Sequence, residues 1–492
     1  MPKTIAALML LLAGAGQAAA QAPTTIVQQG RVAGVSADGI DSFKGLPFAA
    51  PPVDSLRWRP PVTPGPWQGT RDASAYGDAC VQPGADFPMS EDCLTLNVWA
   101  PTGAKKGKPL PVMLWIHGGG SFAGSGRDPG FDGASLARHG VVVVTINYRL
   151  GALGYFVHPA LSAHKGPIAN YGLMDQRAAM QWVQANIAAF GGNPRQVTLF
   201  GESAGGCYVN MWMTSLAAKG LFARAITHSC PQFIASRSLA QGTQRGVALA
   251  HSLGVDGADD AALKRLRALP AKDFVSPAAI KGTYPFIDGT ILREDPFRAM
   301  AAGRVAPLPW MIGSNSFDAS YLPYFGVDIS KPLAAYTPAD RARILATYDA
   351  AHQGDQRAAM QFLSDMVMGA GDRLFGAQAK GPTWLYSFRY EGSDAPNPLG
   401  VAHGDELPYV FGNPRGDLHL SSTADRAVSA KTQAIWADFA KGTLPLSSSW
   451  STARKTIVID RNGSVAPIAS YHRDRLDLAT PFARNAAGPW DP

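Results

Sequence analysis

One serine in the chain stands in a context that is typical of a nucleophile. Residues 197–206 read Val-Thr-Leu-Phe-Gly-Glu-Ser-Ala-Gly-Gly, an apolar, strand-like run followed by the pattern G-x-S-x-G around Ser203. A strand that turns sharply into a helix needs small residues where the backbones crowd, and Gly201 and Gly205 supply them. If the helix begins at Ala204, its free N–H groups face the Ser203 hydroxyl. The pattern predicts a serine nucleophile; the alternative is a chance glycine-rich turn.

A second glycine-rich segment follows another apolar run. Residues 110–116, Leu-Pro-Val-Met-Leu-Trp-Ile, lead directly into His117-Gly-Gly-Gly120. Backbone N–H groups of consecutive glycines at a strand end can turn toward one point, as an oxyanion hole requires. The alternative is a flexible turn, but such a turn rarely follows a buried strand with a histidine in front. We therefore expect this segment to stabilise negative charge.

A serine hydroxyl is a poor nucleophile until a base removes its proton, and histidine is the usual base near neutral pH. In the enzymes that carry a nucleophilic serine within G-x-S-x-G on such a turn, the acid and then the histidine come later in the chain. His403 is favoured because it lies between a strand-like run and a glycine-rich loop. The histidines that follow the serine are His228, His251, His352, His403, His419 and His472.

The acid that orients the base is expected to follow a strand between the serine and the histidine. Asp318 comes shortly after the apolar run at 307–312 and has this strand-then-turn context. From spacing alone the choice remains open, and the competing carboxylates are Asp288, Glu294, Asp295 and Asp328.

The elements that must position these residues alternate between strand and helix. A continuous β-branched run at 141–146 is typical of a central parallel strand, and 383–390 is a further strand. Helices are expected at 175–190, capped by Asp175, and at 425–441. This order predicts an α/β fold with a large, mostly parallel central sheet flanked by helices. Without an internal repeat or linker, we expect residues 21–492 to form one domain.

The N-terminus is typical of a secretory signal peptide. Lys3 is followed by a short apolar run and by Ala18-Ala-Ala20, a small-residue cleavage pattern. We expect residues 1–20 to be removed after Ala20, and the protein to be secreted or periplasmic. The apolar run is too short to span a bilayer, and no other stretch is long enough, so no membrane span is expected.

Composition excludes several partners. The formal charge is +7, but the basic residues are scattered, so nucleic-acid binding is not expected. The four cysteines lack metal-ligand spacing, so no metal site is expected. An even cysteine count in an exported chain favours disulfides. Cys80 and Cys93 are expected to pair; Cys207 and Cys230 form either a second bridge or two buried thiols. Ser229 ends the strand-like run before Cys230, and we place it near the site.

Taken together, these motifs resemble the type-B carboxylesterase/lipase family, which includes cholinesterases and many microbial esterases. The resemblance covers nearly the whole mature chain. It implies the α/β-hydrolase fold, ester hydrolysis and no cofactor. Its motifs are Phe43-Lys-Gly-Leu-Pro-Phe-Ala-Ala-Pro-Pro52, Glu91-Asp-Cys-Leu-Thr-Leu-Asn97, His117-Gly-Gly-Gly120, Asn170-Tyr-Gly-Leu-Met-Asp-Gln176, Phe190-Gly-Gly-Asn-Pro194, Gly201-Glu-Ser-Ala-Gly205 and His403-Gly404.

The resemblance also implies individual roles. Ser203 matches the family nucleophile, His403 the general base and Asp318 the acid, within Gly313-Ser-Asn-Ser-Phe-Asp318. Most members carry Glu at the acid position and Gly after it, whereas this chain has Asp318 and Ala319, so its loop must approach the histidine more closely. The remaining matches are Gly119, Gly120 and Ala204 as oxyanion donors, Glu202 as a carboxylate beside the nucleophile, and Cys80–Cys93 as the first family disulfide.

The sequence therefore predicts a secreted serine carboxylesterase that acts on a small-molecule ester through an acyl-enzyme. Amide hydrolysis or acyl transfer by the same triad is an alternative. Whether the esterase is also an interfacial lipase is a question of subclass. A non-catalytic binding module is a further alternative, although such family members lose the triad and this chain keeps it. The sequence assigns neither a particular ester nor an oligomeric state.

Overall fold

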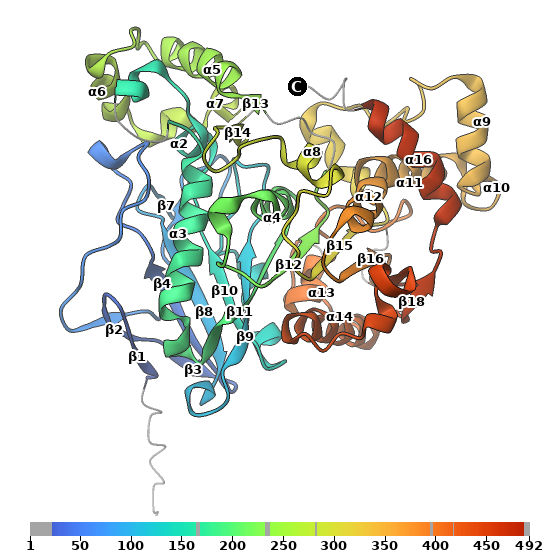
Figure 1. The fold of residues 1–492 in the computed structure, drawn as a ribbon, viewed down its shortest axis with the longest axis horizontal. Coiled ribbons are helices and arrows are strands. Elements are labelled where there is room, and N and C mark those ends of the chain that lie inside the picture. Colours follow the sequence, from blue (N-terminus) through green and yellow to red (C-terminus); the bar gives the residue numbers. More distant parts are fainter. Residues whose placement is uncertain are drawn as a thin grey trace, which may run out of the picture.

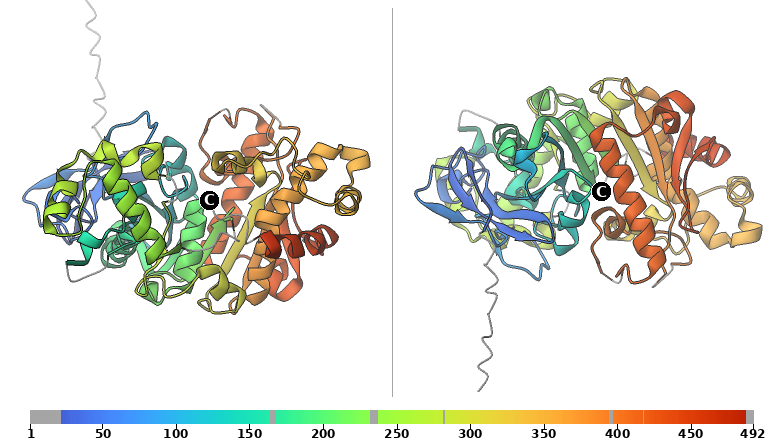
Figure 2. Two further views of the ribbon diagram at one scale, coloured as in Figure 1. Left: turned by 90° about the horizontal axis from the view of Figure 1, so that it is seen from above. Right: turned by 90° about the horizontal axis from the view of Figure 1, so that it is seen from below.

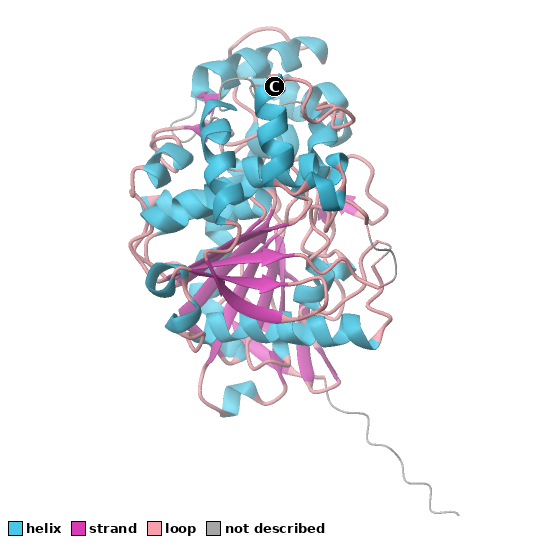
Figure 3. Ribbon diagram, turned by 90° about the vertical axis from the view of Figure 1, so that its right-hand side faces the viewer, coloured by secondary structure: helices cyan, strands magenta, loops and turns pink. Residues whose placement is uncertain are grey.

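An eleven-stranded mixed sheet runs through the molecule and carries helices on both faces (Figures 1 and 3). The computed structural model describes residues 22–163, 168–231, 237–280, 283–393, 397–416 and 418–486. The predicted signal peptide at 1–20 lies outside these residues. The strands stand in the order β18 (Val465–Ala469), β17 (Lys455–Ile459), β16 (Thr383–Phe388), β15 (Trp310–Asn315), β12 (Arg224–His228), β11 (Gly192–Glu202), β9 (Leu110–Ile116), β10 (Val142–Ile146), β8 (Thr95–Pro101), β4 (Ile40–Pro47) and β3 (Val35–Ala37).

The central part of this sheet is parallel from β10 to β17, and the strands at its two edges pair antiparallel. The carboxyl ends of parallel strands meet at one edge of a sheet, which brings the predicted site segments together. The smaller pairings involve β1 (Thr24–Val27) with β2 (Gly30–Ala33) and β5 (Thr70–Asp72), β6 (Ala79–Cys80) with β7 (Met89–Ser90), and β13 (Arg237–Ser238) with β14 (Phe286–Ile287).

Side chains of β9 show why the central strands are apolar throughout. Val112, Leu114 and Ile116 belong to the core on one face, whereas Met113 and Trp115 belong to the core on the other. Helices α3 (Tyr171–Asn186), α4 (Ala204–Thr214), α8 (Pro296–Ala301) and α12 (Ala370–Gln378) cover the first face. Helices α1 (Ala134–Ala137), α13 (Leu407–Phe411) and α14 (Thr423–Lys441) cover the second.

The remaining helices lie around these layers. The blue N-terminal strands and the red C-terminal elements lie at opposite ends of the molecule (Figure 2). No helix in the described ranges is long and apolar enough to cross a membrane. The helices outside the two layers that cover the sheet are α2 (Gly151–Tyr155), α5 (Leu239–Ser252), α6 (Asp260–Ala268), α7 (Pro277–Ile280), α9 (Pro338–Thr347), α10 (Ala350–Gln353), α11 (Asp355–Ser364), α15 (Trp450–Ala453) and α16 (Arg473–Ala486).

Most of the expected elements are present, with one clear correction. The predicted strand at 110–116 is β9, and the predicted helix at 425–441 is α14 with two additional residues at its start. The helix expected at 175–190 instead begins at Tyr171, after Asn170. Asp175 is therefore not its cap. It lies inside the helix, fully buried, because it pairs with a distant arginine.

Both cysteine pairs are bonded in the structure. The expected Cys80–Cys93 disulfide is present. Cys207 and Cys230 form a second disulfide, which decides between the two alternatives left open by the sequence. The second bridge joins the first turns of α4 to the residue that follows Ser229, close to the predicted nucleophile.

The Arg149–Asp175 pair is a buried ion pair with bidentate geometry. Arg149 Nε and Nη2 donate to the two carboxylate oxygens of Asp175 at 2.8 and 2.7 Å, and its backbone N–H adds a bond of 3.0 Å. Burial raises the pKa of Asp175, and the contacts with Arg149 oppose this rise. The pair fixes the residues after β10 to α3.

We expect Arg149→Leu to lower the free energy of unfolding by about 3–5 kcal/mol, because it leaves a buried carboxylate without its partner. Urea denaturation monitored by circular dichroism measures this change. Arg304→Leu is the matched control. It breaks the exposed pair with Glu294 and should leave the free energy of unfolding nearly unchanged, because solvent screens such pairs. Equal, small losses of unfolding free energy in both variants would contradict the interpretation of Arg149–Asp175 as a stabilising buried ion pair.

Candidate active site

Ser203 lies at the sharp turn between β11 and α4. Its backbone is in an unusual conformation, with φ 56° and ψ −125°, and its N–H donates to His228 O at 3.0 Å. The glycines around it are required by close approach. A Cβ on Gly205 would lie 2.1 Å from Ile116 O, and one on Gly201 would lie 2.6 Å from the Gly205 backbone. The predicted nucleophile is thus held on a strained turn, where it remains partly exposed.

Asp318 and His403 come from separate loops that a backbone hydrogen bond holds together. Asp318 begins the 3₁₀ helix Asp318–Phe325 directly after β15, and His403 lies between β16 and α13. The N–H of Phe317 donates to Val401 O at 2.8 Å. His403 Nδ1 lies 2.7 Å from Asp318 Oδ1, a hydrogen-bond distance. The structure therefore brings together the acid and the base that the sequence predicted.

The second oxygen of the Asp318 carboxylate, Oδ2, also accepts hydrogen bonds. It accepts the Ser229 hydroxyl at 2.9 Å and the Asn315 N–H at 2.6 Å. Ser229 and Asp318 are both fully buried. Burial raises the pKa of Asp318, while the hydrogen bond with His403 works in the opposite direction. Ser229, which the sequence placed near the site, thus contacts the acid rather than the nucleophile.

Glu202 lies on the other side of the imidazole. Its Oε1 is 3.1 Å from His403 Nε2. Burial alone would lower the pKa of His403, but the carboxylates of Glu202 and Asp318 outweigh it and raise this pKa to about 9. Burial raises the pKa of Glu202 to about 7 against the opposing effect of His403.

The Nε2 atom of His403 has no hydrogen-bond partner among the described residues. Its polar neighbour, Glu202 Oε1 at 3.1 Å, can as a carboxylate pair with Nε2 only when this nitrogen carries a proton. Catalytic hydrogen bonds are often incomplete before substrate binds, so this arrangement leaves Nε2 able to serve Ser203.

The backbone after β9 offers N–H groups for a substrate oxygen. Gly119 and Gly120 have positive φ angles of 102° and 62°. Among the turn, loop and cap hydrogen bonds of the described residues, none uses the N–H of Gly119, Gly120 or Ala204. A Cβ on Gly118 would lie 3.0 Å from Ser203 Cβ, so this segment borders the predicted nucleophile.

The other acids and histidines considered from the sequence lie in different surroundings. Glu294 forms an exposed pair with Arg304, and His251 and His352 form exposed pairs with Asp256 and Asp349. Asp295 caps α8, and Asp288 accepts an Asn170 hydrogen bond.

Sequence reasoning gave no role to Asn315 or Glu406. Asn315 donates from its side chain to Ala402 O at 2.8 Å and to Glu406 Oε2 at 2.6 Å. The only sequence signal for Glu406 is its place three residues after His403.

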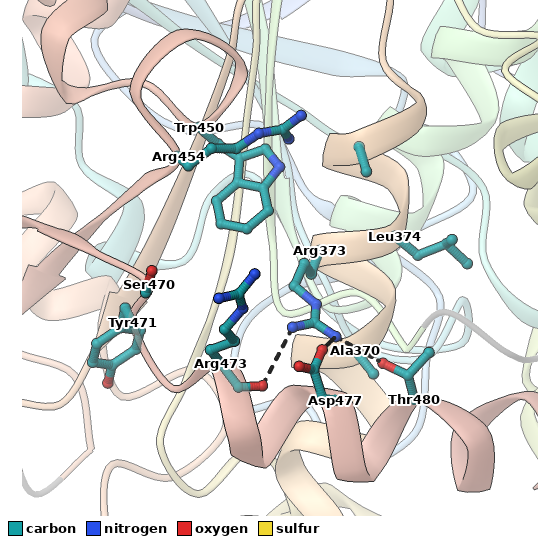
Figure 4. Close-up of a pocket in the computed structure, with 11 residues that line it drawn as sticks. Ala370, Arg373, Leu374, Trp450, Arg454, Ser470, Tyr471, Arg473, Asp477 and Thr480 are labelled. Carbon is teal, nitrogen blue, oxygen red and sulfur yellow. Dashed lines mark hydrogen bonds and ion pairs between the residues drawn. The ribbon is translucent and has the colours of Figure 1, made fainter.

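A cavity of about 430 Å³ lies apart from these residues, between α12, α15 and α16 (Figure 4). Arg373 donates there to Asp477 at 2.6 Å, and the Arg454 guanidinium lies 5.4 Å from the Trp450 ring centre. Among its described lining residues there is no histidine, so it lacks a base for serine chemistry. The described ranges also contain no cluster of three or more His, Cys, Asp or Glu side chains suited to a metal ion.

Comparison with known proteins gives consistent matches over most of the chain. The carboxylesterase family model matches residues 21–469. Fumonisin B1 esterase of Sphingopyxis macrogoltabida is 36% identical over 446 residues, covering 85% of this chain and 82% of that protein. Para-nitrobenzyl esterase of Bacillus subtilis (strain 168) is 35% identical over 482 residues, covering 88% and 94%. A solved structure of PNB esterase matches with a TM-score of 0.75 and 30% identity over 92% of this chain and 99% of that one.

The contact between Glu202 and His403 predicts a pH effect. A histidine base works only when its imidazole is neutral, and the Glu202 carboxylate favours the protonated form of His403. Glu202→Gln should therefore lower the pKa of His403 and move the acidic limb of kcat/KM for ester hydrolysis to lower pH.

Glu294→Gln, which removes an exposed carboxylate that pairs with Arg304, is the control and should leave the limb in place. An acidic limb that stays fixed or moves to higher pH in Glu202→Gln would show that Glu202 does not act on His403 in this way.

Proposed function

Since the chain belongs to the carboxylesterase family, we propose that it hydrolyses carboxylic esters through an acyl-enzyme formed on Ser203. The fold is the α/β-hydrolase fold that the sequence predicted. The observation that carries the mechanism is the 2.7 Å contact between His403 and a buried, hydrogen-bonded Asp318. His403 also contacts Glu202, the residue before Ser203 on its strained strand-to-helix turn.

In the first step, Ser203 Oγ attacks the acyl carbon of the ester while His403 Nε2 takes the hydroxyl proton. The imidazole then carries a positive charge. Asp318 stabilises this charge and holds Nδ1, so that Nε2 faces the reacting atoms. The neutral imidazole supports this assignment, because Nε2 then carries a lone pair to which the neighbouring Glu202 carboxylate, when ionised, has no proton to donate.

The tetrahedral intermediate places negative charge on the former carbonyl oxygen. We assign the N–H groups of Gly119, Gly120 and Ala204 as its donors, because they are uncommitted and border Ser203. The N-terminus of α4 adds its positive dipole end. Loss of one such donor typically costs about 3–4 kcal/mol of transition-state stabilisation.

Collapse of the intermediate releases the alcohol, which takes its proton from His403. Water then attacks the acyl-enzyme with His403 again as base, and the carboxylic acid leaves while Ser203 regains its proton. The residues named account for every proton transfer in this scheme.

We also assign the protein to an exported location. The N-terminal sequence supports this, as do the two disulfides, because such bonds persist mainly in oxidising compartments. A small-molecule ester is the expected partner.

The direct test is hydrolysis of p-nitrophenyl esters from acetate to palmitate by the mature protein and by Ser203→Ala. We expect the variant to lose at least about 10⁴-fold in kcat, because no other group can form the acyl-enzyme. The chain-length profile of the wild type measures the size of the acyl pocket.

Ser252→Ala, at the end of α5, is the matched control and should retain activity. Thermal unfolding of both variants shows whether they are folded. A folded Ser203→Ala variant with wild-type turnover would overturn the assignment of the nucleophile.

A further inference from the structure

His228 is a buried histidine that the proposed mechanism does not use. It ends β12, is fully buried, and lies under α13 and α14 on the face opposite α4. Its Nδ1 is 3.3 Å from Glu406 Oε1, and its Nε2 is 2.9 Å from Trp436 Nε1. Both ring nitrogens therefore have a specific partner, which ordinary packing does not require.

The two partners define how the imidazole is protonated. An indole N–H can only donate, so His228 Nε2 must accept from Trp436 and carry a lone pair. In the neutral ring the proton is then on Nδ1, which donates to the Glu406 carboxylate. The side chain thus presents one donor to Glu406 and one acceptor to Trp436.

Glu406 is a carboxylate inside the protein that is held by several donors. Burial opposes its ionisation, but hydrogen bonds from His228 and Asn315 outweigh this and keep its pKa below the usual value. The Asn315 side chain provides the shorter of these contacts, at 2.6 Å. Glu406 is consequently an anion fixed between β12 and β15.

Asn315 connects this anion to the predicted triad. Its backbone N–H donates to Asp318, and its side-chain amide donates both to Glu406 and to the carbonyl of Ala402, the residue before His403. A rotation of the side-chain amide would free the Ala402 carbonyl, and with it the histidine loop, from the strand end whose backbone N–H holds Asp318. The orientation of Asn315 depends on an accepting carboxylate at Glu406.

We propose that His228 is a positioning residue of the esterase site: by donating to Glu406 it fixes an anion behind Asn315, and thereby fixes Asp318 and His403 relative to each other. This inference rests on the proposed function. The His228 backbone carbonyl accepts the Ser203 N–H, but the His228 side chain contacts no side chain of the triad and acts through Glu406.

The charge of Glu406 acts on ionisable groups of the site, so its loss can be measured as a shift in their titration. Its charge raises the pKa of His403, after the larger effects of burial, Glu202 and Asp318. It also raises the pKa of Glu202. The titratable or charged groups that face Glu406 or its immediate partners are His228, Asp318, Glu202, His403, Asp405, Tyr386 and Arg415.

The experiment compares His228→Leu with His228→Gln by measuring kcat and the pH profile of kcat/KM on a p-nitrophenyl ester. Leucine removes the donor, so Glu406 becomes neutral more readily. We expect kcat to fall about 10-fold and the acidic limb to move to lower pH, because His403 loses a neighbouring negative charge. Glutamine keeps one donor and one acceptor, and should restore the limb and most of kcat.

Two further variants keep the test decisive. Glu406→Gln removes the charge at nearly constant volume and should move the limb in the same direction, even if His228→Leu does not fold. His251→Leu, an exposed histidine on α5, is the matched control and should leave both readouts unchanged.

Wild-type pH profiles in His228→Leu or Glu406→Gln would overturn the proposal, as would a glutamine variant as impaired as the leucine variant. These outcomes are distinct from failure of the proposed function. In that case Ser203→Ala would keep its activity, whatever the behaviour of the His228 variants.

Discussion

The buried carboxylate of Asp318 is the constraint on which the rest of the site depends. An ionised carboxylate is expensive to remove from water unless hydrogen bonds and a positive partner replace its hydration. Here the replacements come from three separate segments: the imidazole of His403, the hydroxyl of Ser229 and the backbone N–H of Asn315. Each of these donors must be in place for the carboxylate to remain charged, so the site and the local fold are stabilised together.

The parallel part of the sheet explains how three distant segments reach one carboxylate. Strands β11, β12, β15 and β16 are neighbours that run in the same direction, so the segments after them leave the sheet at one edge. Ser203 follows β11, and the three groups that reach the carboxylate come from the other strand ends: Ser229 follows β12, Asn315 ends β15, and His403 follows β16. Large apolar side chains on both faces keep these strands in register, and the second disulfide ties the end of β12 to α4. The core and the crosslink therefore position the chemistry.

Local sequence predicted the parts of the site whose signals lie within a few residues. Ser203 could be predicted because the G-x-S-x-G pattern and the strand before it are contiguous, and β9 with its glycines could be predicted for the same reason. Spacing alone left Asp318 among several carboxylates, and the resemblance to a family pattern was needed to choose it. Asp175 was wrongly interpreted as a helix cap, because its actual partner, Arg149, lies outside the helix.

The parts that sequence reasoning missed are those defined by long-range contacts. The Asn315–Glu406 hydrogen bond joins residues 91 positions apart, and His228 meets Trp436 across 208 positions. No pattern within either segment indicates these pairings. His228 was considered only as a candidate base, whereas its two ring nitrogens are committed to Glu406 and Trp436. Polar networks of this kind become visible only once the sheet has brought its strand ends together.

The measurement that tests the central claim most directly is the site of covalent modification by a p-nitrophenyl phosphonate ester, which mimics the tetrahedral intermediate and forms a stable adduct. The account predicts release of one equivalent of p-nitrophenol per protein, loss of esterase activity in proportion, and a phosphonylated peptide containing Ser203 by mass spectrometry. An adduct on another residue that abolishes activity, or full inactivation with Ser203 unmodified, would contradict it.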